Sequence, residues 1–328
     1  MQLARRFGID ITTAEDGDYS AAVARVKKAG ARVTSLSLPW DETETAPGVF
    51  APKSDWLQIA NAFYPAAGLS IALTLSVLDT NRNRLPADLR GRSFDDPAVI
   101  ARACRLLDWV FARIPDLSLD CLALGNEVDI FLGADTKKWA AYTTFFRQTS
   151  AYARTRRPGL RFGSKVTFDG LTGPVGPLAT RLNAPADVIL GTYYGLGAGF
   201  QVKPHAVVAS DFDRLALIAR TGKKPLYLLE CGCPSGAACG SSQAHQARFI
   251  RTVFQQWDKA ASDIPLINFT WLTDRPPAEV RDLTRYYGLS DKAFAEYLST
   301  LALRTWAGKG QDKAAFGALV EEVARRKL

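Results

Sequence analysis

Two glutamates, each at the end of an apolar run, are the residues best placed to do chemistry in this sequence. Glu127 follows the stretch 122–126 (LALGN), and Glu230 follows the stretch 225–229 (PLYLL). A pair of carboxyl groups is the equipment for cleaving a glycosidic bond, because one can protonate the leaving oxygen while the other attacks the sugar or positions a water molecule. The elements that carry the two glutamates must therefore bring them face to face.

The separation of the two glutamates fits one fold in particular. Glu230 lies about 100 residues after Glu127, and an eight-fold strand–helix barrel uses roughly 30 residues per repeat. This separation places Glu127 at the end of the fourth strand and Glu230 at the end of the seventh. Strands and helices alternate along the whole chain, which favours parallel strands with helices outside them and predicts an α/β fold, the (β/α)8 TIM barrel. The expected strands are residues 6–11, 33–40, 69–78, 119–127, 161–168, 187–194, 225–230 and 266–271.

The chain of 328 residues has the usual length of one such barrel. We expect a single barrel domain at residues 1–308, whose last helix runs from about 291 to 306 after a polar loop. Residues 309–328 form a C-terminal helical extension packed on the barrel, with a helix at about 313–327.

Composition narrows the class of protein. Hydrophobic residues make up 47% and charged residues 23%, which is typical of a globular protein. The net charge is +8, but the basic residues are scattered and clusters such as 154–157 lie at expected helix ends, so we expect no nucleic-acid partner. No apolar run approaches the ~18 residues of a membrane span. No leader precedes the first strand, which would suit a mature or trimmed form; we expect a secreted or periplasmic monomer, with a cytoplasmic location still open.

Three cysteines crowd the loop that follows Glu230. They are Cys231, Cys233 and Cys239, and His245 is the histidine nearest to them in sequence. A Cys233–Cys239 disulfide is the preferred interpretation and would point to an oxidising compartment. A zinc site has a spacing that matches no usual ligand pattern, and plain free thiols are the third reading.

The residues around both glutamates resemble a known group of enzymes. Gly125-Asn126-Glu127 on strand four and Glu230 on strand seven look like the catalytic signature of the clan A glycoside hydrolases, which are retaining (β/α)8-barrel glycosidases. The stretches 124–128 (LGNEV) and 230–235 (ECGCPS) are similar to motifs of plant-type endo-1,3-β-glucanases. The loop at 40–50, with its Trp, Glu, Pro-Gly and Phe, also resembles the loop after strand two in many clan members. The strand order extends the resemblance over residues 5 to 306.

The resemblance implies a function and roles for individual residues. The chain would hydrolyse a β-linked polysaccharide or oligosaccharide, and it would need no metal or organic cofactor. Glu127 would be the acid/base and Glu230 the nucleophile. Asn126 would bind the 2-hydroxyl of the sugar, and Tyr193 or Tyr194 at the end of strand six would hold the nucleophile, with a slight preference for Tyr193.

Aromatic and charged residues near strand ends are candidates for binding the sugar. Trp271 ends strand eight and would stack on a sugar face, and Trp40 would do likewise, because an indole presents a flat apolar surface. Core packing is the alternative for both. Further candidates near strand ends are Asp10, Asp79, Asp129, Lys165 and Asp274.

Some features depart from the clan pattern. Members often carry histidines around the catalytic pair, whereas this chain has only His205 and His245, and neither lies on an expected strand. Cys233 occupies a position that is commonly aromatic. These departures keep a second hypothesis open, a catalytically degenerate barrel that binds carbohydrate without cutting it. A metal-dependent barrel hydrolase is less favoured because histidines are scarce near strand ends.

Overall fold

The structure, a computed structural model, describes residues 5–306 and 310–328. Contacts within the chain divide it into two compact units. The first unit comprises Met1–Ser35, Tyr193–Arg220 and Pro225–Leu328, and the second comprises Leu36–Thr192 and Thr221–Lys224. Two of the boundaries between the units fall inside strands, so each of these strands has residues in both units.

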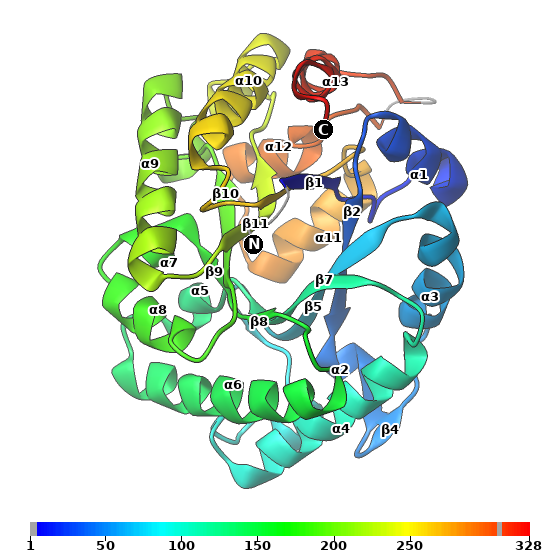
Figure 1. Cartoon of the computed structure of the whole chain (residues 1–328), viewed down its shortest axis with the longest axis vertical. Coiled ribbons are helices and arrows are strands. Elements are labelled where there is room, and N and C mark those ends of the chain that lie inside the picture. The colour runs from blue at the N-terminus through cyan, green and yellow to red at the C-terminus, as the bar shows by residue number, and fades with distance from the viewer. Residues whose placement is uncertain (1–4, 307–309) are drawn as a thin grey trace. The chain divides into compact units, whose positions relative to one another are not determined.

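Parallel pairing dominates the sheet, whose hydrogen-bonded order is β8-β7-β5-β2-β1-β12-β11-β10-β9. The order begins on β8 and ends on β9, which are two pieces of one short segment, so the sheet returns to its starting point. The short strand β6 pairs antiparallel with β5, and β3 pairs with β4 in a separate hairpin. The strands are β1 (Arg6–Ile9), β2 (Val33–Pro39), β3 (Glu44–Ala46), β4 (Val49–Phe50), β5 (Ser70–Asp79), β6 (Arg82–Asn83), β7 (Leu119–Asn126), β8 (Phe162–Gly163), β9 (Lys165–Thr167), β10 (Ile189–Tyr194), β11 (Leu226–Gly232) and β12 (Leu266–Phe269) (Figure 1).

The eight expected strands are confirmed. In the first unit β1 runs beside β12 in register, from Arg6 opposite Leu266 to Ile9 opposite Phe269. In the second unit β5 and β7 pair along most of their length, with shifts of register near both ends. The expected fifth strand is divided into β8 and β9 by Ser164, whose hydroxyl donates to the carbonyl of Leu124 at 2.6 Å.

The helices alternate with the strands, and most begin at a polar residue. Asp135, for example, accepts hydrogen bonds from the backbone N–H groups of Lys137 and Lys138 and so satisfies donors that have no partner within the helix. Among the described residues, no helix is both long and apolar enough to cross a membrane. The α-helices are α1 (Tyr19–Lys28), α2 (Trp40–Thr43), α3 (Trp56–Ala67), α4 (Pro97–Arg113), α5 (Val128–Leu132), α6 (Thr136–Arg156), α7 (Phe168–Thr172), α8 (Gly176–Asn183), α9 (His205–Gly222), α10 (Gln243–Ala260), α11 (Pro277–Tyr287), α12 (Lys292–Thr300) and α13 (Ala314–Arg326).

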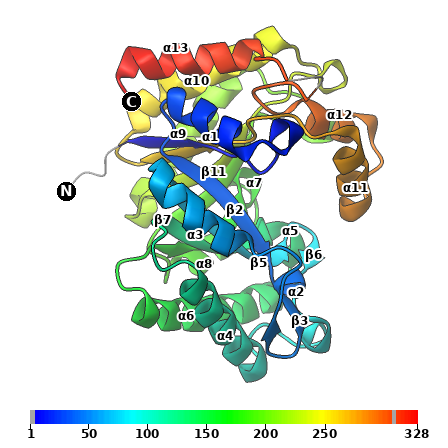
Figure 2. The ribbon, with the colours of Figure 1, turned by 90° about the vertical axis from the view of Figure 1, so that its right-hand side faces the viewer.

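Each unit has its own packed helices. In the second unit α4 contacts α6 (Figure 1). In the first unit the expected C-terminal helix is present as α13, and it lies against α10 (Figure 2). Apolar side chains of both helices are buried at this contact, among them Phe254 and Leu319. Arg326 at the end of α13 also pairs with Asp258 of α10 at 2.6 Å.

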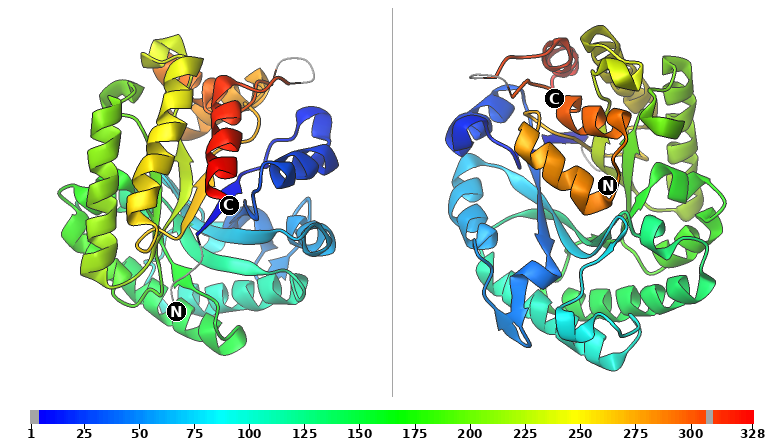
Figure 3. Two further views of the ribbon diagram at one scale, coloured as in Figure 1. Left: turned by 45° about the horizontal axis from the view of Figure 1, so that its top comes forward. Right: turned by 180° about the vertical axis from the view of Figure 1, so that it is seen from behind.

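The prediction for the segment after the last strand was wrong. The expected polar loop contains a helix, α11, and the expected helix from 291 to 306 ends as α12 at Thr300. The two helices contact each other and lie close together in Figure 3. Helix α11 is hard to recognise from sequence because Val280 is its one buried residue. Gly288, with φ +72°, then ends the helix in a left-handed conformation that glycine adopts without strain.

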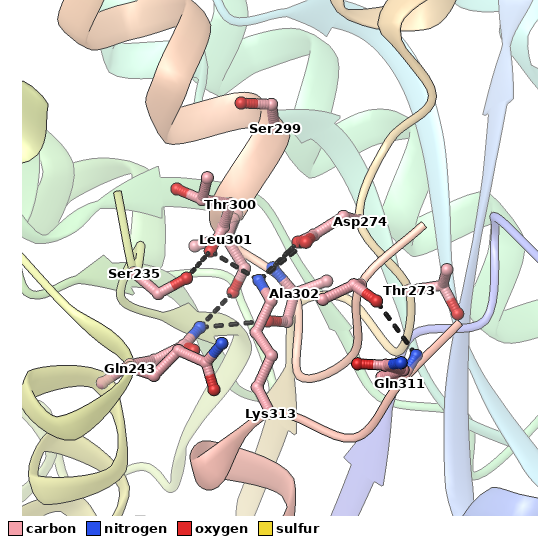
Figure 4. Close-up of polar contacts among 12 residues, drawn as sticks. Ser235, Gln243, Thr273, Asp274, Ser299, Thr300, Leu301, Ala302, Gln311 and Lys313 are labelled. Atoms are coloured by element: carbon pink, nitrogen blue, oxygen red, sulfur yellow. Dashed lines mark hydrogen bonds and ion pairs between the residues drawn. The ribbon is translucent and has the colours of Figure 1, made fainter. Parts of the chain in front are cut away.

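A buried ion pair joins the C-terminal segment to the segment after β12 in the first unit. The ammonium of Lys313 lies 2.7 Å from the carboxylate of Asp274 and donates to the carbonyl of Thr300 at 3.0 Å (Figure 4). The N–H of Ala302 donates to Asp274 at 3.0 Å. Burial raises the pKa of Asp274 to about 6, and Lys313 opposes that rise. Asp274 is therefore a structural residue, not the sugar ligand that its place in the sequence suggested.

We predict that Lys313→Met lowers the free energy of unfolding by about 3–5 kcal/mol at pH 7, because it leaves a buried carboxylate without its partner. The loss should shrink as the pH falls towards 4. Asp274 then becomes protonated in the folded protein, and a neutral carboxyl needs no counter-charge.

Denaturant unfolding at several pH values measures this. Lys292→Met, which removes an exposed lysine from α12, is the control. The double variant Lys313→Met/Asp274→Leu should recover most of the lost stability. A double variant as unstable as Lys313→Met alone would contradict the pairing.

Candidate active site

Glu127 lies directly after the carboxyl end of β7, in the second unit, at a bend of the backbone. It has a left-handed conformation with φ +45° and precedes helix α5. Gly125, two residues earlier, has φ +83°, and a side chain there would collide with the hydroxyl of Tyr142. A non-glycine residue in the left-handed region carries backbone strain, which is common at functional sites. The bend turns Glu127 out of the regular strand at the end of β7.

Two hydroxyl groups hold the carboxylate of Glu127. Thr80, directly after β5, donates to Oε2 at 3.0 Å, and Thr192 of β10 donates to Oε1 at 2.7 Å. Thr80 lies after β5 and Thr192 lies on β10, and together they fix both oxygens of the Glu127 carboxylate. Hydroxyl groups orient a carboxylate without neutralising its charge.

Asn126 is oriented by Asp79. Its Nδ2 donates to Oδ1 of Asp79 at 2.8 Å, whereas its Oδ1 is buried and has no hydrogen-bond partner within the described chain. An unpaired buried acceptor is costly in a folded protein, so this oxygen has the character of a ligand-binding group. Asp79, which the sequence suggested as a sugar ligand, orients the side chain of Asn126 through this hydrogen bond.

Glu230 lies near the end of β11, in the first unit, and accepts a hydrogen bond from a tyrosine. The hydroxyl of Tyr194 donates to its Oε2 at 2.5 Å. The Tyr194 ring packs edge-on against Tyr297 of α12, with ring centroids 5.5 Å apart. Helix α12, which follows the barrel strands, therefore fixes the tyrosine that holds Glu230.

The slight preference for Tyr193 over Tyr194 was wrong. Tyr193 is fully buried, and its hydroxyl donates at 3.0 Å to Asp211 of α9, which also pairs with Lys203 at 2.8 Å. Burial and the nearby Asp211 carboxylate raise the pKa of Tyr193. Successive residues of a strand point to opposite faces, and Tyr193 faces the helix while Tyr194 faces Glu230.

Two further candidates of the first unit, Asp10 and Trp271, lie at strand ends. Asp10, which follows β1, accepts hydrogen bonds from the N–H and the hydroxyl of Thr12 and from the hydroxyl of Ser35 at 2.6 Å. The chain itself therefore uses most of its acceptor capacity. Trp271 is partly exposed, and the guanidinium of Arg275 lies over its ring, 4.1 Å from the centroid.

Trp40 does not present its ring to a ligand. It is completely buried, and its indole N–H donates to Glu44 at 2.7 Å. Glu44 also accepts from the N–H of Gly48 at 2.6 Å and pairs with Arg102. The Trp–Glu–Gly pattern after strand two is therefore a structural network within the second unit, and core packing is the correct reading of Trp40.

Asp129 and the cysteine loop have structural roles too. Asp129 is buried and accepts from the N–H and the hydroxyl of Thr167 at 2.9 and 2.6 Å, which ties α5 to β9. The preferred disulfide is contradicted: Cys231, Cys233 and Cys239 are buried free thiols, and burial raises their pKa values. In the described part of the chain no three metal-binding side chains gather into a site.

Sequence reasoning missed several residues of this region. Thr192 lies two residues before Tyr194, so strand alternation was the available signal for it, whereas the signal for Thr80 was its place directly after a strand end. Ser35 and Arg275 carried no such signal, because their positions depend on contacts made after folding.

Comparison with known proteins gives the fold. No family model matches this sequence, and no curated protein matches it. A solved structure of GH5_18 from Streptomyces cattleya in complex with GlcNAc matches with a TM-score of 0.76 at 17% identity, over 100% of this chain and 81% of that chain.

Two other structures match in the same way. An exo-β-1,4-mannosidase from Opitutaceae bacterium strain TAV5 matches with a TM-score of 0.75 at 16% identity, over 99% of this chain and 60% of that chain. A β-glucosidase from Exiguobacterium marinum matches with 0.68 at 12% identity, over 99% and 98%. At these identities the likeness establishes the fold, and this chain is a (β/α)8 barrel.

The two histidines lie together on helices of the first unit. His205 begins α9 and His245 is in the first turn of α10, with ring centroids 4.3 Å apart. Burial lowers the pKa of both, and Arg248 lowers both further. Neither histidine lies on a strand, as the sequence analysis expected.

We predict that acid destabilises the protein partly through this pair. A histidine whose pKa is lower in the folded than in the unfolded state favours folding when neutral, and this contribution is lost as the pH falls below about 6.5. Thermal unfolding between pH 7.5 and 5 should therefore show a steeper loss of Tm in the wild type than in His205→Gln/His245→Gln. Parallel curves would contradict this contribution.

Proposed function

We propose that the protein is a retaining β-glycoside hydrolase in which Glu127 is the acid/base and Glu230 is the nucleophile. The observation that carries the proposal is that each glutamate lies at the carboxyl end of a parallel strand and is oriented by hydroxyl donors. The active sites of (β/α)8-barrel enzymes lie at this end of the strands. Glu127 and Glu230 belong to the fourth and seventh of the strands that the sequence predicted.

Each glutamate accepts a hydrogen bond from a hydroxyl group of β10. Thr192 donates to Glu127, and Tyr194 donates to Glu230. Residues two apart in a strand point to the same face and are separated by roughly 6–7 Å along it. A retaining glycosidase requires a separation of ~5–5.5 Å between its two carboxyl groups, and the proposal predicts this separation for Glu127 and Glu230.

The proposed reaction has two steps. In the first, Glu230 attacks the anomeric carbon while Glu127 protonates the departing glycosidic oxygen, which gives a glycosyl ester on Glu230. In the second, Glu127 removes a proton from water, and the water displaces Glu230 from the sugar. Tyr194 keeps Glu230 aligned for attack. The unpaired Oδ1 of Asn126 would accept a hydrogen bond from a sugar hydroxyl, and Trp271 would stack on a sugar ring.

The substrate class follows from the same site and from the structural neighbours. The neighbours include an exo-β-1,4-mannosidase, a β-glucosidase and a GH5_18 protein bound to GlcNAc, which supports β-glucosides and β-mannosides as the first substrates to test. The similarity to endo-1,3-β-glucanases, the polymeric size of the substrate, the monomeric state and the secreted or periplasmic location stay predictions from the sequence.

The test is a kinetic comparison of wild type, Glu127→Gln and Glu230→Gln on aryl β-glycosides with good and poor leaving groups and on β-glucans and β-mannans. Glu230→Gln should lose activity on every substrate by on the order of 10³-fold or more. Glu127→Gln should lose about 10²–10⁴-fold where the leaving group is poor, and much less where it departs without protonation.

Glu321→Gln, a change on the exposed surface of α13, is the matched control. Unchanged activity in either site variant would contradict the assignment. A wild type that binds oligosaccharides but cleaves none of the panel would favour the degenerate carbohydrate-binding barrel instead.

The two neighbouring tyrosines give a separate prediction. Tyr194→Phe should lower kcat/KM by about 10–100-fold, because it removes one hydrogen bond to a charged carboxylate, and should leave the Tm nearly unchanged. Tyr193→Phe should lower the free energy of unfolding by about 1–2 kcal/mol and leave kcat/KM nearly unchanged, because its partner Asp211 is a structural residue. The reverse pattern would contradict the roles given to the two tyrosines.

A further inference from the structure

Arg275 is held beside Trp271 by two contacts. It lies between β12 and α11, and its guanidinium carbon is 4.1 Å from the centroid of the Trp271 ring. Its Nη1 donates at 2.9 Å to Glu279, in the first turn of α11. The side chain is only 14% exposed. Stacking on the indole and pairing with Glu279 fix the plane and the orientation of the guanidinium.

One edge of this guanidinium is unused by the described chain. The Nε–H of Arg275 is buried and has no hydrogen-bond partner, and Nη2 makes no hydrogen bond among the described residues. Nε and Nη2 share the edge opposite to Nη1, so their N–H groups point in parallel. Leaving a buried donor of a charged group without a hydrogen bond destabilises the folded protein. An oriented edge whose Nε is buried and unpaired is typical of a ligand-binding group.

The chemistry of the edge selects the ligand. Two parallel N–H donors match the two oxygens of a carboxylate, and this bidentate pairing is the strongest hydrogen-bonded contact that arginine makes. A single sugar hydroxyl that accepted from Nη2 would leave the buried Nε–H without a partner. Because the guanidinium lies 4.1 Å from the centroid of the Trp271 ring, a sugar chain that contacts this indole lies near Arg275.

The surroundings permit an anionic ligand. Glu279 is the acidic partner of Arg275, and it occupies Nη1 rather than the free edge. Glu279 itself is 45% exposed, so solvent screens its charge. The whole chain carries a net charge of +8, which favours the approach of anionic polymers.

We propose that Arg275 binds the carboxylate of an acidic sugar, so that the preferred substrate is a β-linked glycan that contains uronic acid units. This inference rests on the proposed glycosidase function and names its substrate class. Arg275 is a specificity determinant that takes no part in bond cleavage. The Nε edge, together with the adjacent indole, distinguishes an acidic sugar from its neutral counterpart.

Matched oligosaccharides test the proposal. Cello- and laminari-oligosaccharides are compared with the same chains oxidised at C6, in which each CH₂OH has become a carboxylate and the linkage is unchanged. Binding is measured by calorimetry with Glu230→Gln protein, so that the result does not depend on turnover. For at least one of the two linkage types, the oxidised chain should bind about 10–100-fold more tightly than its neutral form. This difference in affinity should decrease at high salt.

Three variants locate the effect. Arg275→Gln should abolish the preference for the oxidised chain and change the affinity for the neutral chain little. Arg275→Lys, which keeps the charge but lacks the fork, should retain only a small part of the preference. Arg285→Gln, on α11 with a side chain 77% exposed, is the control and should retain all of it. Thermal unfolding checks that each variant is folded.

The outcomes separate this inference from the proposed function. Equal affinity for oxidised and neutral chains, or an equal loss for both in Arg275→Gln, would overturn the inference. Preference for a sulfated chain over a carboxylated one would overturn it as well. Cleavage of neutral aryl glycosides without any preference for acidic chains would leave the glycosidase function standing alone. Arg275-dependent binding of acidic chains without cleavage would support the inference and contradict the glycosidase function.

Discussion

The alternation of side chains along β10 is the constraint on which both glutamate sites depend. Thr192 and Tyr194 point to one face of the strand and donate to Glu127 and Glu230. Tyr193 points to the other face and donates to Asp211 of α9. A shift of the strand by one residue would exchange these faces and remove both contacts at once. The hydrogen bond between Tyr193 and Asp211 opposes such a shift, because it ties the strand to its helix.

Neutral donors hold the carboxylates at the strand ends. Threonine hydroxyls contact Glu127, a tyrosine hydroxyl contacts Glu230, and the amide of Asn126 contacts Asp79. Such donors fix the direction of a carboxyl group without adding a counter-charge, so a nucleophile can stay ionised and an acid/base can change its protonation state. The ion pair between Lys313 and Asp274 has a different task. It is buried, its two side chains also form hydrogen bonds with backbone groups, and it fixes the segment that follows Trp271.

Much of this arrangement could be predicted from the sequence, because strand periodicity and the apolar runs before Glu127 and Glu230 are local signals. The eight strands were found for that reason. The choice between Tyr193 and Tyr194 needed the face of the strand, which their identical side chains do not reveal. Trp40 was misread because a buried indole and an exposed one look the same in sequence, and because its partner Glu44 is paired with Arg102 of another element. Helix α11 was missed because it is short and mostly polar, with a narrow apolar stripe of Val280, Leu283 and Tyr287.

The most direct test of the account is to trap the covalent intermediate. The protein is incubated with 2-deoxy-2-fluoro-β-glucosyl and β-mannosyl fluorides, with the Glu127→Gln variant alongside, and the intact mass and the labelled peptide are measured. We expect one added glycosyl group, located on Glu230, and none on Glu230→Gln protein. An adduct on any other residue, or turnover that releases a product of inverted anomeric configuration, would contradict the central claim.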